Sequence, residues 1–148
     1  MKNKKTIIIA IILIILASIG IYYYTIVVPH QKAVVDFENA VSVVTEKNKE
    51  LESFLSEADE LIEKNETPYD ESTLQKVKES AESARNSLRA IPEMDKNTEE
   101  INKQVEQLNE PIDYTKFIEN LHLAFKEYKH SVSQYKSLTQ VRSLLNLV

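Results

Sequence analysis

An uninterrupted apolar stretch near the N-terminus is the feature that most constrains this chain. Residues 6–28 read TIIIAIILIILASIGIYYYTIVV and contain no charged side chain. A helix of these 23 residues is about 34 Å long, enough to cross the roughly 30 Å hydrocarbon core of a bilayer. The stretch therefore predicts a single transmembrane anchor. It leaves a leader at residues 1–5 and an external domain at residues 29–148.

The charges that flank this stretch predict its orientation. Lys2, Lys4 and Lys5 precede it, whereas only His30 and Lys32 follow it closely. Positively charged flanks stay on the cytoplasmic side of a membrane. We therefore expect a cytoplasmic N-terminus and an extracytoplasmic C-terminal domain, with the three leader lysines at the inner membrane interface.

Three consecutive tyrosines mark the other end of the anchor. Tyr22, Tyr23 and Tyr24 are placed where a phenol can keep its ring in the apolar layer and its hydroxyl near water. They are the predicted membrane-interface residues of the outer side.

A cleaved signal peptide is the alternative interpretation of the same stretch. The run Ser18-Ile19-Gly20 has the two small residues of a cleavage site. However, the apolar run continues to residue 28, and signal peptides have apolar cores of only about 7–15 residues. The length favours an uncleaved signal anchor.

The composition excludes several classes of function. Without the three leader lysines the chain has 15 basic and 23 acidic residues, a net charge of −8, which is unsuited to nucleic acid or anionic lipid. There is no cysteine, and the single glycine, Gly20, lies in the anchor. Lipoprotein processing, disulfides, thiolate metal sites and glycine-rich phosphate loops are therefore excluded. We expect no cofactor and no nucleic-acid partner.

The external part has the three-and-four apolar spacing of helices, divided by prolines and capping residues. The predicted helices are 29–65, a second helix that ends at residue 91 and has Thr67, Asp70 or Ser72 as its N-cap, 98–110 and 113–144, the last two with Asn97 or Thr98 and then Asp113 as N-caps. The row of core-facing residues along each helix, its seam, is expected to be Val34, Phe37, Val41, Val44, Asn48, Leu51, Leu55, Ala58 and Ile62; Leu74, Val77, Ala81, Ala84, Leu88 and Ile91; Ile101, Val105 and Leu108; and Ile118, Leu121, Phe125, Tyr128, Val132, Tyr135 and Thr139.

Helix lengths suggest how these elements combine. The first and last predicted helices are about 55 and 48 Å long, and the two middle ones about 30 and 20 Å. The two short helices placed end to end match one long helix. We therefore expect an all-α fold in which the anchor precedes an elongated antiparallel helical bundle with three legs, the middle one broken. A four-helix bundle is the alternative.

Candidate binding groups are few. Asn48 is the one polar residue of its seam; it can fix helix register, lie half-exposed or, with the Tyr128/Tyr135 pair, face a ligand.

Two Glu-x-x-His pairs begin at Glu119 and Glu127 and have the spacing of di-iron ligands, but both lie on one helix at outer positions. We expect these side chains to be solvated, and we expect no catalytic residues and no metal site.

The C-terminus is unusually apolar. Leu144, Leu145, Leu147 and Val148 surround one asparagine. Two interpretations remain open: a last turn that packs on the end of the bundle, or a surface that docks a partner or leads into another domain.

Several short runs carry a resemblance. Residues 29–34 (PHQKAV), 49–51 (KEL), 92–94 (PEM), 113–115 (DYT) and 131–136 (SVSQYK) are similar to uncharacterised small membrane-anchored proteins of low-GC Gram-positive bacteria. The likeness covers most of the chain and implies a helical extracytoplasmic part followed by a further domain. It implies no catalytic or binding residues.

Two hypotheses for function follow. The first is a single-pass anchored helical protein that acts as a structural or protein-interaction module, by binding a protein partner or by self-association. The second is a sensory or small-ligand-binding ectodomain that works through a partner subunit, because the leader at residues 1–5 is too short for an output domain. An enzyme is not expected.

Overall fold

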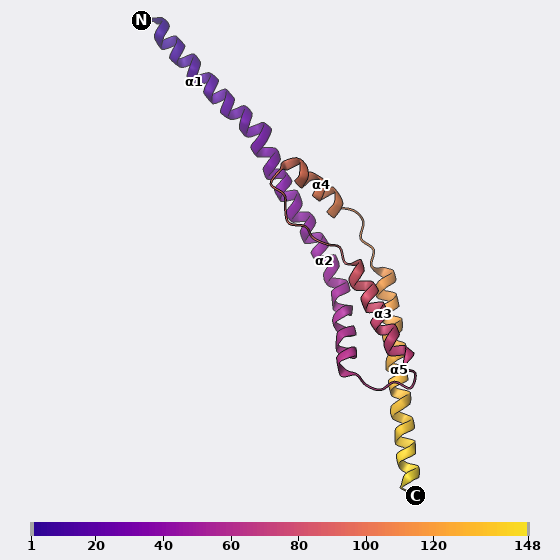
Figure 1. The fold of residues 1–148 in the computed structure, drawn as a ribbon. Coiled ribbons are helices and arrows are strands. Elements are labelled where there is room, and N and C mark those ends of the chain that lie inside the picture. The colour runs from indigo at the N-terminus through magenta and orange to yellow at the C-terminus, as the bar shows by residue number, and fades with distance from the viewer. Residues whose placement is uncertain (1, 148) are drawn as a thin grey trace. The chain divides into compact units, whose positions relative to one another are not determined.

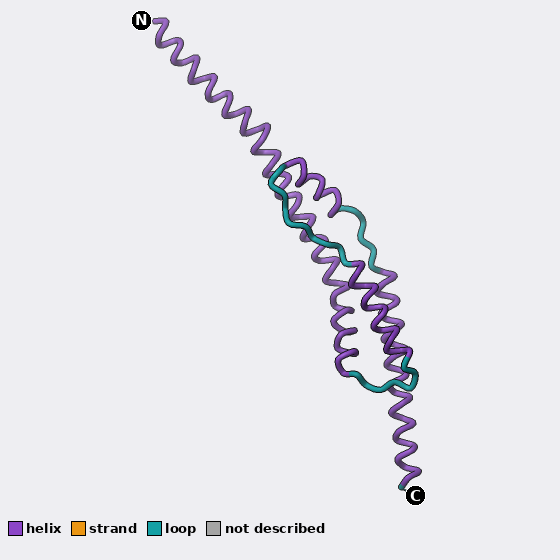
Figure 2. Tube along the Cα trace, viewed as in Figure 1, coloured by secondary structure: helices purple, strands orange, loops and turns teal. Residues whose placement is uncertain are grey.

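A computed structural model of the chain describes residues 2–147, with side chains from Asn3 onward. The elements are α1 (Lys2–Tyr22), a π-helical turn (Tyr23–Val27), α2 (Val28–Lys64), α3 (Ser72–Ser87), α4 (Thr98–Leu108) and α5 (Thr115–Asn146). Within the described residues there is no strand (Figure 2). The all-α prediction, with a long apolar N-terminal helix followed by further helices, is confirmed.

The chain divides into two compact units. Unit 1 comprises residues 1–43 and 91–110, and unit 2 comprises residues 44–90 and 111–148. Helix α2 supplies residues to both. The rod-like and four-helix arrangements concern the chain as a whole and stay predictions.

In unit 1, helix α4 lies beside the first part of α2 (Figure 1). Phe37 and Ile101 are buried there, together with Ala33, Ala40 and Leu108. The predicted cap at Asn97 is confirmed, because its side chain accepts a hydrogen bond of 2.8 Å from the Glu99 amide. Next to this cap, His30 Nδ1 lies 2.9 Å from Thr98 Oγ1.

Unit 2 is a three-helix bundle of the second part of α2, α3 and α5. Ion pairs fix the directions of its helices: Lys129 meets Glu57 and Lys136 meets Glu66, each at 2.7 Å, so α5 runs parallel to α2. Helix α3 runs the opposite way: the chain just before it bonds to Ser131, far along α5, whereas Arg89, just after it, bonds to Tyr114 at the start of α5 and to Asn48. Consecutive helices of this unit are therefore antiparallel.

The core of unit 2 follows the predicted seams. Its buried residues are Leu51, Leu55, Ala58, Leu61, Val77, Ala81, Ala84, Tyr114, Leu121, Ala124, Phe125, Tyr128 and Val132. The small side chains of Ala81 and Ala84 are completely buried on α3, which lets the two longer helices approach it closely. Burial of this continuous apolar face is the main stabilising contribution to the bundle.

The turn between α2 and α3 is built from polar contacts. Helix α2 ends where Asn65 takes a positive φ of 44°, a left-handed conformation that asparagine tolerates better than most residues. The following chain packs on α5, because the Tyr69 and Asp70 amides donate hydrogen bonds to Ser131. The Asp70 carboxylate then accepts from the amide and hydroxyl of Ser72, where α3 begins.

The predicted end of α3 at residue 91 was wrong. The helix ends at Ser87, and Leu88 turns out of it with a ψ of 131°. The reason lies in the next residue, whose backbone is held by two side chains: the Arg89 amide donates to the Tyr114 hydroxyl, and the Arg89 carbonyl accepts from Asn48. Ile91, an expected seam residue, is consequently 41% exposed.

The start of α5 also differs from the prediction by one position. The residue that caps this helix is Tyr114, which makes no side-chain capping bond. Asp113 precedes it, and its carboxylate accepts a hydrogen bond of 2.9 Å from the Thr115 amide. Asp113 therefore supports the first turn of α5 from just outside the helix.

Candidate membrane anchor and partner-docking surface

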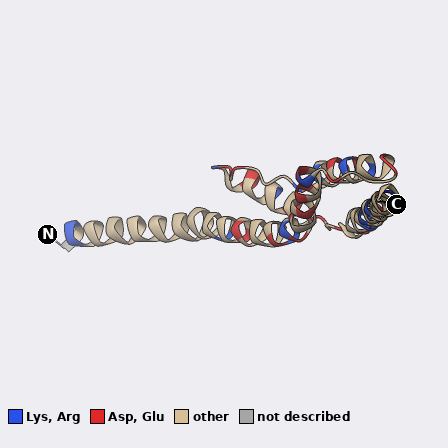
Figure 3. Cartoon of the chain, turned by 90° about the horizontal axis from the view of Figure 1, so that it is seen from below, with Lys and Arg blue, Asp and Glu red and all other residues tan. Residues whose placement is uncertain are grey.

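Helix α1 and the π-helical turn form one apolar rod. No described side chain between residues 3 and 28 is buried, and Figure 3 shows α1 free of charged residues beyond its first turns. The described residues thus contain one helix long and apolar enough to cross a membrane, with a window of mean hydropathy 2.6. An apolar helix without protein cover suits a lipid environment.

The predicted interface residues lie at the two ends of this rod. Lys4 and Lys5 are exposed in the first turns of α1, whereas the side chain of Lys2 lies outside the described part. Tyr22, Tyr23 and Tyr24 are all exposed, and as consecutive helical residues they point in three directions around the axis. The rod from Lys5 to Tyr23 covers about 27 Å, close to the thickness of a hydrocarbon core.

The π-helical turn lies immediately before Pro29. Because proline has no amide hydrogen, the carbonyl four residues earlier, that of Thr25, lacks its usual helical donor. The chain changes here to π-type bonding, in which the Val28 amide donates to the Tyr23 carbonyl. The helical backbone thus passes through the proline without ending, and the anchor continues into α2.

Asn48 is a buried structural residue. Its side chain is 9% exposed; Nδ2 donates to the Arg89 carbonyl at 2.9 Å, and Oδ1 accepts from the Tyr114 hydroxyl at 2.6 Å. The half-exposed interpretation is therefore wrong. Both polar atoms of the amide already have partners within the protein, so Asn48 presents none to a ligand.

Tyr128 and Tyr135 do not line a common site. Tyr128 is 1% exposed, and its hydroxyl donates to the Glu66 carbonyl at 2.9 Å. Burial raises the pKa of the Tyr128 phenol, and the nearby Glu66 carboxylate adds to this shift. Tyr135, in contrast, is 41% exposed, because it lies at the level where α2 has already ended.

The C-terminal part of α5 has no cover in unit 2. Every residue of the C-terminal segment, which we define as residues 133–147, is exposed. Leu144, Leu145 and Leu147 are 65%, 70% and 82% exposed, and Val148 lies outside the described residues. For the described leucines, the interpretation in which this run packs on the end of the bundle is therefore wrong.

Sequence reasoning missed the full length of this surface. Tyr135 and Thr139 were expected in the core seam, yet both are exposed. Leu138 and Val141 are 53% and 54% exposed and extend the apolar surface toward Leu145. Apolar spacing shows which residues share a helix face, but the ends of the neighbouring helices decide whether that face is covered.

The Glu-x-x-His residues lie on the surface of α5. Glu119, His122 and His130 are exposed, and Glu127 forms an ion pair of 2.8 Å with Lys76. Among the described residues, no group of three histidine, aspartate or glutamate side chains is placed to hold a metal ion.

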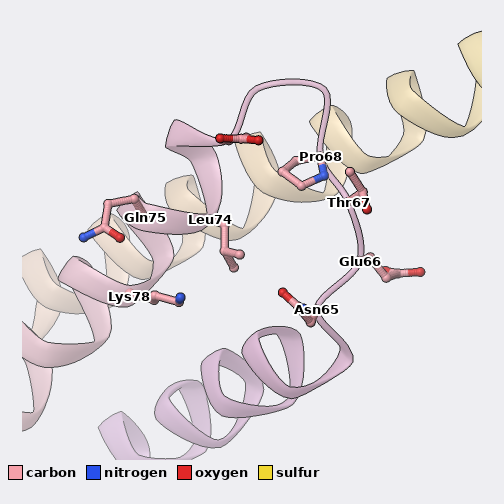
Figure 4. A pocket seen from close by; sticks show the side chains of 8 residues that line it. Asn65, Glu66, Thr67, Pro68, Leu74, Gln75 and Lys78 are labelled. Carbon is pink, nitrogen blue, oxygen red and sulfur yellow. The ribbon is translucent and has the colours of Figure 1, made fainter.

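A hollow of about 330 Å³ lies at the turn between α2 and α3. It is lined by Asn65, Glu66, Thr67, Pro68, Glu71, Leu74, Gln75 and Lys78. Figure 4 shows Leu74 and Lys78 of α3 directed toward the space above Asn65. Glu66 is instead engaged by Lys136 of α5. The lining brings together no nucleophile and base, so it offers only a polar depression on the surface.

Comparisons with known proteins give no relative. No protein-family model, curated protein or solved structure matches this chain.

Proposed function

We propose that this protein is a single-pass membrane protein whose N-terminus lies in the cytoplasm and whose helical part lies outside the membrane. In this proposal it acts as a structural or protein-interaction module. The resemblance to anchored proteins of low-GC Gram-positive bacteria supports a bacterial cell membrane as its location.

The orientation rests on the charges at the two ends of the apolar rod. The leader lysines Lys2, Lys4 and Lys5 stand at one end, without an acidic residue among them. At the other end Lys32 pairs with Asp36 at 3.0 Å, which offsets its charge. The more positive end is the one that stays in the cytoplasm.

The exposure of the C-terminal segment is the observation that supports the interaction role. It is helical as far as Asn146, yet none of its residues is buried. About four helical turns with exposed leucine, valine and tyrosine add no hydrophobic stabilisation while they stay uncovered. We therefore assign this segment to a protein partner.

Photo-crosslinking tests the interaction role. A photoreactive phenylalanine analogue at Leu144 of the full membrane-bound chain is expected to give a protein adduct on illumination. The same analogue at Asn86, an exposed position of α3, is the control and should give none. The absence of any protein adduct from Leu144 and from a second position, Leu147, would overturn this role.

Cysteine labelling tests the orientation, and it needs no background mutations because the chain has no cysteine. Intact cells carrying Ser83→Cys are expected to react with a membrane-impermeant maleimide. Cells carrying Asn3→Cys should react only after lysis. The reverse pattern would overturn the orientation, and loss of the labelled leader from the mature chain would show that the anchor is cleaved.

The sensory alternative has less support. The polar groups that it would use, on Asn48 and Tyr128, are hydrogen-bonded within unit 2. A ligand would have to displace these bonds at a cost of about 1–3 kcal/mol for each buried group left unpaired. The interaction role is therefore the function we propose.

A further inference from the structure

The uncovered apolar residues of the C-terminal segment have heptad spacing. Leu138, Val141 and Leu145 follow one another at intervals of three and four, and all are more than half exposed. In heptad terms they occupy positions a, d and a of a coiled-coil seam. We propose that this row is the seam of a parallel coiled coil between copies of this chain, an inference that rests on the interaction role proposed above.

The row lies beside the face that α5 buries inside the bundle. Seven-residue steps back from Leu138 and Leu145 reach Ser131 and Ala124, both of which are buried in unit 2. The same steps back from Val141 reach Gln134 and Glu127, neither of which is buried, so the row shares only one edge with the buried face of α5.

The charges of the segment permit two copies to pair in parallel. No acidic residue follows Glu127 in the sequence, and the segment itself carries only Lys136 and Arg142 as charged side chains. With Leu138 at position a, Arg142 occupies e and faces Ser137 at g of the other copy. No like charges meet across the seam.

The second basic residue is also compatible with pairing. Lys136 occupies position f, on the outer side of such a coil. Its ammonium group is bound to Glu66 of the same copy at 2.7 Å, so the segment keeps Arg142 as its remaining positive charge. An anionic membrane surface would be a poor occupant, because such binding needs clusters of basic residues and the external part carries a net charge of −8.

The membrane anchor determines the direction of pairing. Two copies that cross one bilayer in the same direction can be related only by a rotation axis along the membrane normal. Such an axis leaves the component of each helix along the normal unchanged. Two C-terminal segments that pair along this axis therefore run in the same direction, which brings like residues together at Val141 and at Leu145.

The length of the seam predicts that association depends on the membrane. Two helices meeting along about four turns form an interface smaller than the roughly 1,200–2,000 Å² of stable complexes. Anchoring both copies in one membrane raises their effective concentration and compensates for the small interface. We therefore expect the copies to pair in the bilayer and to separate on dilution into detergent.

Cysteine crosslinking of the full chain in membrane vesicles tests the seam. Val141→Cys and Leu145→Cys place thiols at two seam positions, and Ser143→Cys, between them on the outer face, is the matched control. With copper phenanthroline as oxidant, we expect disulfide-linked dimers several-fold faster from Val141→Cys and Leu145→Cys than from Ser143→Cys. Because all three positions are exposed, the substitutions should leave the bundle folded.

A mixed sample tests the direction. Vesicles that contain both Leu138→Cys and Leu145→Cys chains should give like-with-like dimers, since these positions are about 10 Å apart along the helix. Preferential mixed dimers would mean antiparallel pairing and would overturn the proposal. Equal rates for the seam positions and for Ser143→Cys would mean random collision and would also overturn it.

The crosslinks also separate this inference from the interaction role itself. An adduct from the photoreactive analogue at Leu144 to a different protein, without any self-adduct, would overturn self-pairing and leave the interaction role standing. Lipid adducts without protein adducts would overturn both.

Discussion

The Tyr114 hydroxyl donates a hydrogen bond of 2.6 Å to Oδ1 of Asn48, 66 residues earlier in the sequence. The backbone of Arg89 closes the contact into a ring, because its amide donates to the Tyr114 oxygen at 2.8 Å and its carbonyl accepts from Asn48 Nδ2 at 2.9 Å. The ring joins α2 to the residues that end α3 and precede α5. It fixes the position of three chain segments at one end of the bundle in unit 2.

Replacing Asn48 with leucine should destabilise the fold. The substitution leaves the Arg89 carbonyl and the Tyr114 hydroxyl without their Asn48 partner, which costs about 1–3 kcal/mol for a buried polar group. We expect the free energy of unfolding of the full chain in detergent to fall by this amount in urea titrations followed by circular dichroism. If Asn48 were only a polar residue in an apolar seam, without these hydrogen bonds, the same substitution would raise the free energy of unfolding.

Tyr114→Phe provides the partner substitution for a double-mutant cycle. It keeps the ring in the core but leaves the Arg89 amide and Asn48 Oδ1 without their Tyr114 partner, so the loss should also be about 1–3 kcal/mol. Because the two residues share one hydrogen bond, we expect the double variant Asn48→Leu, Tyr114→Phe to be less destabilised than the sum of the two single variants. Additive losses would contradict the ring.

Leu121 and Leu123 give a second, matched comparison on α5. Leu121 is completely buried, whereas Leu123, two positions along the same helix, is 56% exposed. Leu121→Ala should lower the free energy of unfolding by about 2–5 kcal/mol, because it removes apolar contacts and leaves a cavity. Leu123→Ala should change it by no more than about 0.5 kcal/mol. Similar losses for the two variants would contradict the assigned face of α5.

Local sequence predicted the helices better than it predicted their ends. The three-and-four spacing identified Leu51, Val77 and Leu121 as core residues, and all three are completely buried. Asn97 was recognisable as a cap because its side chain acts on an amide two residues away. The end of α3 was not recognisable, since Asn48 and Tyr114 hold Arg89 from 41 and 25 residues away.

The C-terminal segment shows the same contrast: its apolar residues were evident from the local sequence, but their exposure depends on other helices. The apolar C-terminal run was visible in the sequence, and Leu144 and Leu145 were named from it. Tyr135 and Thr139 were assigned to the core because their spacing continues the seam of α5 without a break. Their exposure follows from the ends of α2 and α3, which the spacing within α5 does not encode.

The buried phenol of Tyr128 should make stability fall at alkaline pH. Burial raises the pKa of Tyr128 above the ordinary 10.0 of tyrosine, so the unfolded chain loses this proton at lower pH than the folded chain does. The contribution is therefore fully present below about pH 10 and is lost as pH rises toward the folded pKa. We expect the free energy of unfolding of Tyr128→Phe to decline less steeply above about pH 10 than that of the natural chain.

Two further observations check the Tyr128 assignment. At neutral pH, Tyr128→Phe should be less stable by about 0.5–1.5 kcal/mol, because it loses the hydrogen bond to the Glu66 carbonyl. Tyr135→Phe, at an exposed position of the same helix, should change the free energy of unfolding at neutral pH by no more than about 0.5 kcal/mol. An unchanged profile for Tyr128→Phe would contradict the assignment.

Truncation should separate folding from partner binding. A chain that ends after Ser137 keeps the ion pair between Lys136 and Glu66 and loses no buried residue among those the structure describes. Its free energy of unfolding should remain within about 0.5 kcal/mol of the full chain, while crosslinking through the C-terminal segment disappears. A chain that ends after Glu127 is the contrasting variant, because it also loses the buried Tyr128 and Val132 and should unfold far more easily. If the first truncation destabilised the bundle by several kcal/mol, the segment would be part of the fold and not a docking surface.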